Sequence, residues 1–195
     1  MIRRPLFALG LLGLGVAAGA CGDVAEARSV VCGAQPIAVL QNGGFDDSTP
    51  PWVQTPVTPA LLCGAPTITP DQGALAACLG ATDNAMQELS QTVALPAGAT
   101  SATLRGRICI ATAEVDAVDR DELTIELVDG ANVVATLGHW TNQQGASACT
   151  FMNVDLSSAL TDDPPTVTFR LRAALNATMP TSFYVDSLAL TIGCD

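Results

Sequence analysis

From about residue 36 to its end, the chain is dominated by short segments in which apolar and polar residues alternate. Clear examples are 101–112, 122–141 and 166–173, and segments rich in Gly, Pro and Asp separate them. A period of two residues is typical of strands that bury one face, and no window after the first 20 residues has the period of a helix. The 195 residues suffice for one domain with a real core. Many short strands at regular spacing predict an all-β fold, an antiparallel β-sandwich or a barrel.

Each alternating segment predicts which side chains face the core. The segment 122–141 also has the signal of a β-hairpin, because Asp129-Gly130 suits a tight turn between two alternating runs. Two pairs of arginines take the outward positions of their strands, where they form a polar strip or pair with the many acidic residues. These are Arg105, Arg107, Arg170 and Arg172. The inward positions are Leu89, Val93, Leu95, Leu104, Ile108, Ile110, Leu123, Ile125, Leu127, Met152, Val154, Leu156, Val167, Phe169 and Leu171.

The last strand contains a break in its alternation. Phe183 and Val185 share one parity, whereas Leu188 and the apolar residues at every second position after it share the other. A period of two cannot keep both sets inward, so we expect a β-bulge at Asp186-Ser187. Asp186 then takes an inward position, and a buried carboxylate needs a partner. That partner is a cation or a set of hydrogen bonds within the bulge.

The N-terminus has the features of an export signal. Arg3 and Arg4 precede an apolar run, 6–18, that is too short to span a bilayer, and small residues follow it. One interpretation is a secretory signal cleaved after Ala20. The other is a bacterial lipoprotein signal, because Cys21 comes directly after that site and "AGAC" resembles a lipobox.

The number of cysteines favours the lipoprotein interpretation. The chain has 7 cysteines. If Cys21 carries lipid, an even set remains, which is typical of a disulfide framework in an exported protein. The remaining cysteines are Cys32, Cys63, Cys78, Cys109, Cys149 and Cys194. The predicted organisation is a signal peptide at 1–20, a lipidated tether at 21–35 and a β-sandwich binding domain at 36–195. The predicted location is the cell envelope, at the outer membrane or cell surface, or else outside the cell.

The charge of the chain limits its partners. All 8 basic residues are arginines, against 19 Asp and Glu, for a net charge of −11. Removal of Arg3 and Arg4 with the signal leaves 6 arginines against the same 19 acidic residues, a net charge of −13. Such a surface argues against nucleic acid, which needs a basic footprint, and it suits cations, neutral sugars or basic partners. Contact with a membrane is expected only through the lipid anchor, and the sequence does not indicate the oligomeric state.

An ordered set of segments resembles a known family. The segments are "NGGFDDSTPPWV", "GALAACLGATDNAMQELSQTVALPAGATSATLRGRICIAT", "DELTIELVDGANVVATLGHWTN", "VDLSSAL" and "TSFYVDSLAL". Together they look like the galactose-binding-like jelly-roll domains of secreted bacterial proteins. That family includes many carbohydrate-binding modules and the accessory domains of secreted peptidases. The resemblance covers about Ile37 to Ile192.

The resemblance implies contacts between distant segments. First and last strands lie side by side in such domains, which would bring Cys32 near Cys194. In the same implied layout Cys63 and Cys78 flank a short excursion and would close it, and Cys109 and Cys149, in central segments, are the remaining pair. Members also often carry a structural calcium ion. Transferred to this chain, its ligands are the side chain of Asp46, a carbonyl near Gly73, and Asp186. The alternative is an Asx turn at Asp46 and a hydrogen-bonded bulge at Asp186.

The two tryptophans are candidates for sugar stacking. Trp140 lies in the polar, glycine-flanked segment "GHWTNQQG", where Asn142, Gln143 and Gln144 would bind hydroxyl groups. The alternative for both tryptophans is packing, which is favoured for Trp52 because it follows two prolines and is placed to plug one end of the sandwich.

The sequence does not indicate catalysis. His139 is the only histidine, and the chain has no G-x-S-x-G, P-loop or C-x-x-C motif. We therefore expect a non-catalytic, exported and lipid-anchored binding module that binds carbohydrate or a cell-surface partner. The alternative is a structural or adhesion lipoprotein that acts by protein–protein contact and has no sugar site.

Overall fold

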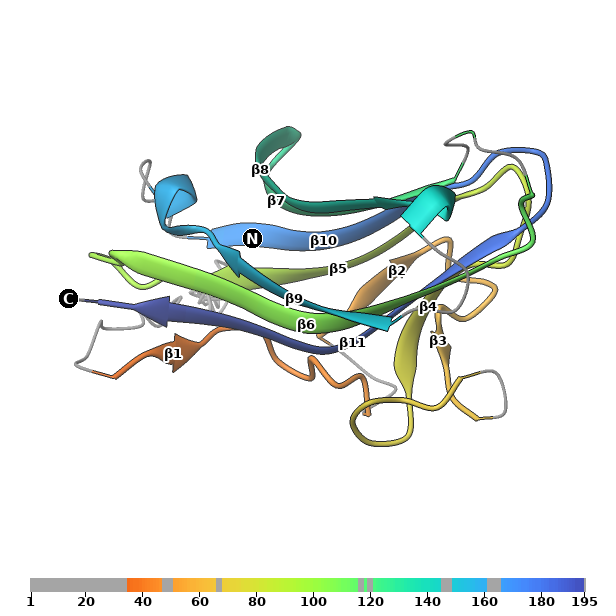
Figure 1. The fold of residues 1–195 in the computed structure, drawn as a ribbon. Coiled ribbons are helices and arrows are strands. Elements are labelled where there is room, and N and C mark those ends of the chain that lie inside the picture. Colours follow the sequence, from red (N-terminus) through yellow and green to blue (C-terminus); the bar gives the residue numbers. More distant parts are fainter. Residues whose placement is uncertain are drawn as a thin grey trace, which may run out of the picture.

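The described residues form two antiparallel sheets packed face to face, a jelly-roll β-sandwich (Figure 1). The structure is a computed structural model that describes residues 35–46, 51–65, 68–115, 118, 121–144, 149–160 and 166–194. Its strands are β1 (Ile37–Ala38), β2 (Val53–Thr55), β3 (Leu62–Cys63), β4 (Ala76–Gly80), β5 (Met86–Ala94), β6 (Ser101–Thr112), β7 (Glu122–Asp129), β8 (Asn132–Thr141), β9 (Cys149–Asp155), β10 (Thr166–Ala174) and β11 (Thr181–Gly193). Two short 3₁₀ helices complete it, η1 (Asn142–Gln144) and η2 (Ser157–Leu160). In the part of the chain so described, no helix has the length and apolar character needed to cross a bilayer.

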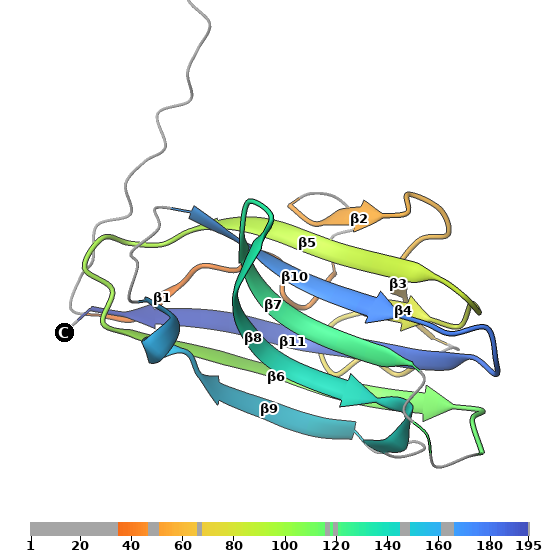
Figure 2. The same cartoon turned by 90° about the horizontal axis from the view of Figure 1, so that it is seen from above.

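The connections between strands bring the two ends of the domain together. The six-stranded sheet has the order β3-β4-β11-β6-β9, and β1 also pairs with β11. The five-stranded sheet has the order β2-β5-β10-β7-β8. First and last strands are therefore neighbours, as the resemblance implied, with Ile37 opposite Ile192. In Figures 1 and 2 the loops that follow β4, β6 and β10 lie at the opposite end of the sandwich from β1 and the end of β11.

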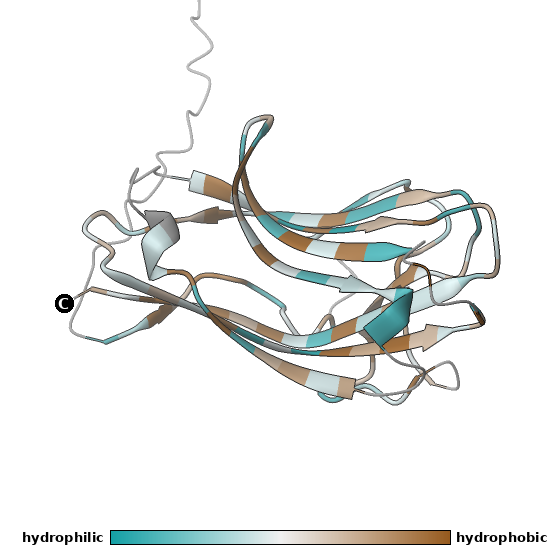
Figure 3. Ribbon diagram, turned by 45° about the horizontal axis from the view of Figure 1, so that its top comes forward, coloured by the Kyte–Doolittle hydropathy of each residue, from teal (hydrophilic) through white to brown (hydrophobic). Residues whose placement is uncertain are grey.

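The core consists of the inward residues of both sheets. The predicted inward positions are buried, with Val154 only half-buried, and Figure 3 shows the alternation as bands along the strands. Trp52 packs its ring 5.1 Å from Phe45 and 6.1 Å from Phe169, centroid to centroid. Its Nε1 donates a hydrogen bond to the carbonyl of Asn42 at 2.9 Å. Trp52 thus packs against the core, which is the interpretation that its sequence context favoured.

The predicted bulge in β11 is present. The pairing of β11 with β6 breaks between Asp186 and Ala189, and Ser187 has a φ of 54°. Asp186 and Leu188, although only two residues apart across the break, are each 5% exposed. The bulge thus turns apolar residues of both parities toward the core.

The "NGGF" segment fits against this bulge. The carbonyl of Gly43 accepts a hydrogen bond from the N–H of Leu188 at 2.9 Å. A Cβ atom on Gly43 would lie 1.8 Å from the carbonyl oxygen of Leu188. Phe45, at a φ of 57°, then turns its side chain into the core, where it is fully buried. Gly43 is therefore required by the closeness of two backbones.

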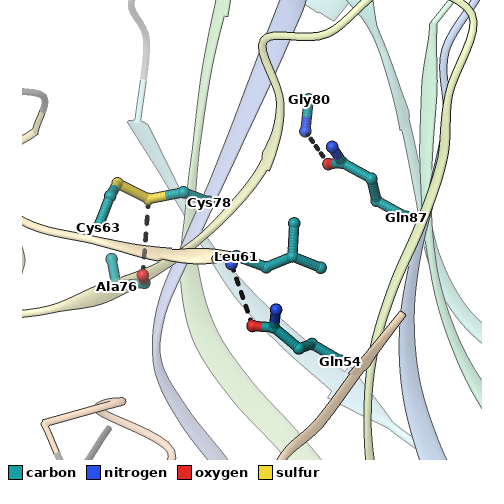
Figure 4. The surroundings of a disulfide bond; sticks show 7 residues. All are labelled: Gln54, Leu61, Cys63, Ala76, Cys78, Gly80 and Gln87. Carbon is teal, nitrogen blue, oxygen red and sulfur yellow. Dashed lines mark hydrogen bonds between the residues drawn. A yellow bond between two sulfur atoms is a disulfide. The ribbon is translucent and has the colours of Figure 1, made fainter. Parts of the chain in front are cut away.

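Two predicted disulfides are present. Cys63 bonds to Cys78, next to the loop that joins β2 to β3 (Figure 4), and Cys109 bonds to Cys149 across β6 and β9. Cys194 is also disulfide-bonded. Its expected partner Cys32 lies outside the described residues, as do the signal peptide, the lipidation site Cys21 and the tether up to residue 34.

We expect Gly43→Ala to lower the free energy of unfolding by about 3 kcal/mol, because the added methyl group must push two backbones apart. Gly44→Ala is the matched control, since a Cβ there would meet first the end of the Gln72 side chain at 3.1 Å. The control should cost less than about 1 kcal/mol. Urea denaturation measures both, and equal losses would show that the fit against Leu188 is not the cause.

Candidate functional site

The outer face of the five-stranded sheet carries a set of charged side chains. The β7–β8 hairpin bends away from the other sheet (Figures 1 and 3), so this outer face is concave along β10, β7 and β8. The alternation that buries apolar residues turns the polar residues of the same strands onto this face. We call the following set the charged face: Glu88, Glu122, Glu126, His139, Arg170 and Arg172.

Arg170 is at the centre of the charged face. It lies directly opposite Glu126 of β7, and its Nε and Nη2 donate to the Oε2 of Glu126 at 3.0 and 2.6 Å. Its Nη1 lies 3.8 Å from an oxygen of Glu88 on β5, and the same oxygen lies 3.6 Å from the Nε of Arg172. The two arginines of β10 are thus paired with a glutamate on each neighbouring strand, β5 and β7. The pairing holds the planar guanidinium groups in fixed orientations.

A pocket of about 350 Å³ opens where the charged face reaches the loops. Glu122 belongs to both, and it is also 3.1 Å from the Nε2 of His139. The pocket combines two amide side chains and one carboxylate with apolar side chains. We call it the loop-end pocket, and its lining is Asn84, Ala85, Met86, Glu122, Ala174, Leu175 and Asn176.

Hydrogen bonds join the loops around this pocket. The N–H of Leu175 donates to the carbonyl of Ala85 at 2.8 Å, and the N–H of Asn84 donates to the carbonyl of Asn176. The fully buried Asp121 accepts a hydrogen bond from the N–H of Asn176 at 2.9 Å. These bonds fix the turn between β4 and β5 against the loop between β10 and β11.

The four residues predicted to bind sugar lie beside the pocket. Trp140 is opposite the buried Leu123, so its ring is on the inward side of β8, half-buried against the core and stacked over Gly138. Asn142 is 4% exposed, and its Nδ2 donates to the carbonyl of Val118 at 2.9 Å.

The other two amides make similar contacts. The Nε2 of Gln143 donates to the same carbonyl of Val118 at 2.9 Å. The Oε1 of Gln144 accepts from the N–H of Thr141 at 2.9 Å. All three amide side chains therefore hold the chain that borders the pocket, and a direct role of Trp140 and these amides in ligand binding stays a prediction.

The three residues predicted to bind calcium are held to one turn of the chain. The Oδ2 of Asp186 accepts hydrogen bonds from the N–H groups of Asp71 and Gln72 at 2.6 and 3.0 Å. The Oδ1 of Asp46 accepts one from the N–H of Ala74 at 2.7 Å. Gly73, between these donors, has a φ of 65°, and a Cβ on it would lie 1.6 Å from Asp46. The resemblance thus predicted correctly that these positions meet.

The oxygens of this cluster are largely occupied by N–H donors. The Oδ1 of Asp186 accepts from the N–H of Ser187 at 2.6 Å, so both of its carboxylate oxygens have backbone partners. Calcium takes six to eight oxygen ligands. Among the described residues, no three His, Cys, Asp or Glu side chains come together in a way that could hold a metal. The carboxylate of Asp186 thus makes the hydrogen bonds that the alternative to calcium, a hydrogen-bonded bulge, requires. The binding of calcium by these residues stays a prediction.

Buried glutamines are structural residues that the sequence analysis missed. Gln87 and Gln91 are each 2% exposed, on the same parity of β5 as Leu89 and Val93. The amide of Gln91 donates to the carbonyl of Gln41 and accepts from its N–H, at 2.9 and 2.8 Å. The alternation along β5, with a period of two residues, already places both glutamines on the inward side. They were missed because only apolar residues were counted as inward.

Comparisons with known proteins identify the fold. No family model and no curated protein matches the sequence. The carbohydrate-binding module TmCBM61, solved with β-1,4-galactotriose, has a TM-score of 0.55 and 16% identity over 79% of this chain and 97% of its own. A Stig cyclase, Fisc, from Fischerella sp. TAU has a TM-score of 0.51 and 15% identity over 83% of this chain and 100% of its own. The enzymatically active domain of tailspike protein 4 of bacteriophage CBA120 has a TM-score of 0.51 and 12% identity over 80% of this chain and 21% of its own.

At these identities the likeness shows the fold. The chain is a jelly-roll β-sandwich similar to that of a carbohydrate-binding module. The three similar proteins differ in what they do, which agrees with the general observation that one fold hosts many functions. The function of this chain must therefore be argued from its own site. Its disulfides are typical of exported proteins.

We expect Asp186→Asn to lower the free energy of unfolding by about 2 kcal/mol, because an amide nitrogen replaces an oxygen that accepts backbone N–H groups. The loss should be the same in calcium and in EDTA, as measured by thermal melting. Asp83→Asn, at an exposed position, is the control. A loss that appears only with calcium would instead assign the stabilisation to a bound cation.

We expect Trp140→Ala to lower the free energy of unfolding by about 2 kcal/mol, roughly half the loss for a fully buried Trp, because the ring packs against the core. Urea denaturation checks this. An unchanged free energy of unfolding would mean that the ring is free to stack on a ligand.

Proposed function

We propose that this chain is a non-catalytic, exported binding module that holds carbohydrate on the charged face and in the loop-end pocket. The observation that carries the proposal is the continuity of the two through Glu122. Sugar hydroxyl groups both donate and accept hydrogen bonds. The charged face offers them fixed guanidinium donors and carboxylate acceptors within a few ångströms of each other.

The charge of the protein favours a neutral glycan. The whole chain carries −11, so an acidic polysaccharide would be repelled at long range. On the charged face itself, Arg170 and Arg172 are balanced by carboxylates. The fold is the same as that of a module solved with a galactotriose, which supports a glycan without specifying one.

The proposal assigns no catalysis to the site. In the described structure, the one histidine, His139, contacts Glu122, and no Ser, Thr or Cys side chain is hydrogen-bonded to it. The nucleophile–base pair of a hydrolytic triad is therefore missing there.

We further propose anchoring through an acylated Cys21. A tether of about 15 residues would then enter the domain at β1, at the opposite end of the sandwich from the loop-end pocket. The pocket would point away from the membrane, toward polymers outside the cell.

A second candidate function is contact with a protein. Four apolar side chains are exposed at the end of the sandwich that carries the loops after β4, β6 and β10. They are Val115, Val118, Met179 and Met86, with exposed fractions of 89%, 49%, 48% and 47%. Exposed apolar residues that gather in one region are typical of protein-binding surfaces. This function would leave a glycan array without signal and would make Val115→Asp lose a defined partner protein.

We expect Arg172→Ala to weaken binding to the recognised polysaccharide roughly tenfold, the effect of losing about 1.4 kcal/mol of contacts. The melting temperature should hardly change, because a partly exposed ion pair contributes less than about 1 kcal/mol. A glycan array identifies the polysaccharide, and affinity electrophoresis measures the retention.

Arg105→Ala is the matched control for this experiment. Arg105 takes an outward position on β6, on the other face of the sandwich, and it donates to the Oδ1 of Asn153 at 3.3 Å. Equal effects of the two variants, or an array without signal, would contradict the proposed site.

A further inference from the structure

A second, smaller pocket lies at the edge of the sandwich, beside the Cys63–Cys78 disulfide. Its volume is about 210 Å³, below the roughly 300–1,000 Å³ of pockets that enclose drug-sized ligands. The loop from β2 to β3 forms one wall, and β4 and the start of β11 form the others. The turn between β4 and β5 separates it from the loop-end pocket, and the two share no lining residue. We call it the edge pocket.

The wall formed by the β2–β3 loop is held in place by one side chain. The Nε2 of Gln54 shares its two hydrogens among the carbonyls of Pro56, Val57 and Pro59, at 3.3, 2.5 and 3.3 Å. Its Oε1 accepts from the N–H of Leu61 at 3.2 Å, as Figure 4 shows. The disulfide fixes the end of the same loop to β4. The pocket is therefore preformed, which reduces the entropy lost when a ligand binds.

Gln87 lines the edge pocket with an unused hydrogen-bond donor. The residue is 2% exposed, and its Oε1 accepts from the N–H of Gly80 at 2.6 Å (Figure 4). The N–H of Gly80 requires an acceptor, so the amide oxygen of Gln87 must point toward it. The amide nitrogen, Nε2, is then the end that remains without a protein partner in the described structure. No acceptor for this Nε2 exists among the residues that the structure describes. The atom is not enclosed, because the one fully enclosed side-chain nitrogen or oxygen without a partner among the described residues is the Oδ2 of Asp121. The Nε2 of Gln87 therefore faces the solvent in the pocket, and a ligand that supplies an acceptor would replace a water molecule there.

The rest of the lining defines the chemistry of that ligand. Leu61, the disulfide and the ring of Tyr184 offer apolar contact, and Thr82 and Ser182 add hydroxyl groups. None of the residues that line the pocket is charged, in a chain that has 19 acidic residues. A charged ligand would lose its hydration here without gaining an opposite charge.

We propose that the edge pocket binds one uncharged sugar ring. The apolar C–H face of a pyranose fits against Tyr184 and Leu61, and a ring or hydroxyl oxygen accepts the hydrogen bond from Gln87. The ring is either a free monosaccharide or the terminal residue of a glycan. Its binding does not depend on the charged face, so either site can exist without the other.

The test uses the whole β-domain with its disulfides intact and a panel of neutral methyl pyranosides. Nuclear magnetic resonance follows the backbone N–H of Gly80 and the side-chain amide of Gln87. We expect at least one neutral pyranoside to shift both signals, and the corresponding uronic acid to shift neither. An oligosaccharide that ends in the same ring distinguishes the two sources: tighter binding than the monosaccharide indicates a glycan end, and equal binding indicates the free sugar.

Two variants examine the pocket itself. Ala60→Trp, on the exposed wall, should fill the pocket and weaken binding roughly tenfold, with an unchanged melting temperature. Ala97→Trp, at an exposed position that does not line the pocket, is the matched control. Gln87→Met removes the donor directly, and Ala60→Trp keeps the test valid if that variant fails to fold.

Three results would overturn the proposal. They are the absence of any shift across the panel, binding unaffected by Ala60→Trp, and shifts confined to the charged face. The third result would leave the proposed function standing while removing the edge pocket. Loss of polysaccharide retention in Arg172→Ala, with pyranoside binding intact in the same variant, would show that the two sites are separate.

Discussion

The packing of three distant backbone segments around the bulge in β11 determines much of this structure. At the bulge, Leu188 donates its N–H to Gly43, and the carboxylate of Asp186 accepts the N–H groups of Asp71 and Gln72. The bulge also interrupts the edge of β11, so that β4 pairs with the residues before it and β1 with those after it. A carboxylate that would be costly to bury is stabilised by backbone groups that would otherwise lack partners. One irregularity thus places the first strand, the turn before β4 and the last strand relative to one another.

Most of the fold follows from the sequence, because one face of each strand is buried. Alternation in 101–112, 122–141 and 166–173 predicted the strands and the inward residues, and the parity change before Leu188 predicted the bulge. The prediction missed the strands β2, β3 and β4, and the segment of β4, AACLG, has no clear alternation of apolar and polar residues. The strands β2 and β3 have only three and two residues, too few for a period, and side-chain contacts of Gln54 hold the loop between them.

The site was less predictable because polarity in a sequence does not indicate what a polar group contacts. Asn142, for example, is buried and bonded to the carbonyl of Val118, a contact that its sequence context did not indicate, and its role in ligand binding stays a prediction. The sequence predicted that Arg170 and Arg172 either form a polar strip or pair with acidic residues, but it could not name the partners, because cross-strand register places them beside Glu88 and Glu126. Register depends on the whole sheet, so no local pattern could show it. The resemblance implied correctly that Asp46, Gly73 and Asp186 lie at one turn, because it carried information about contacts between distant segments, and their binding of calcium stays a prediction.

The disulfides Cys63–Cys78 and Cys109–Cys149 both lie in the six-stranded sheet and have an unequal effect on the two sheets. Cys63–Cys78 ties the edge strand β3 to β4, and Cys109–Cys149 ties the other edge strand β9 to β6, so both margins of the six-stranded sheet are covalently closed. The margins of the five-stranded sheet, β2 and β8, depend on hydrogen bonds and packing within the described structure. Opening fluctuations and amide hydrogen exchange should therefore concentrate on the sheet that carries the charged face. The cross-linked six-stranded sheet would then act as a rigid support for the five-stranded sheet, whose edges can adjust. Under the proposed function, a long polymer would bind to the five-stranded sheet without disturbing the six-stranded one.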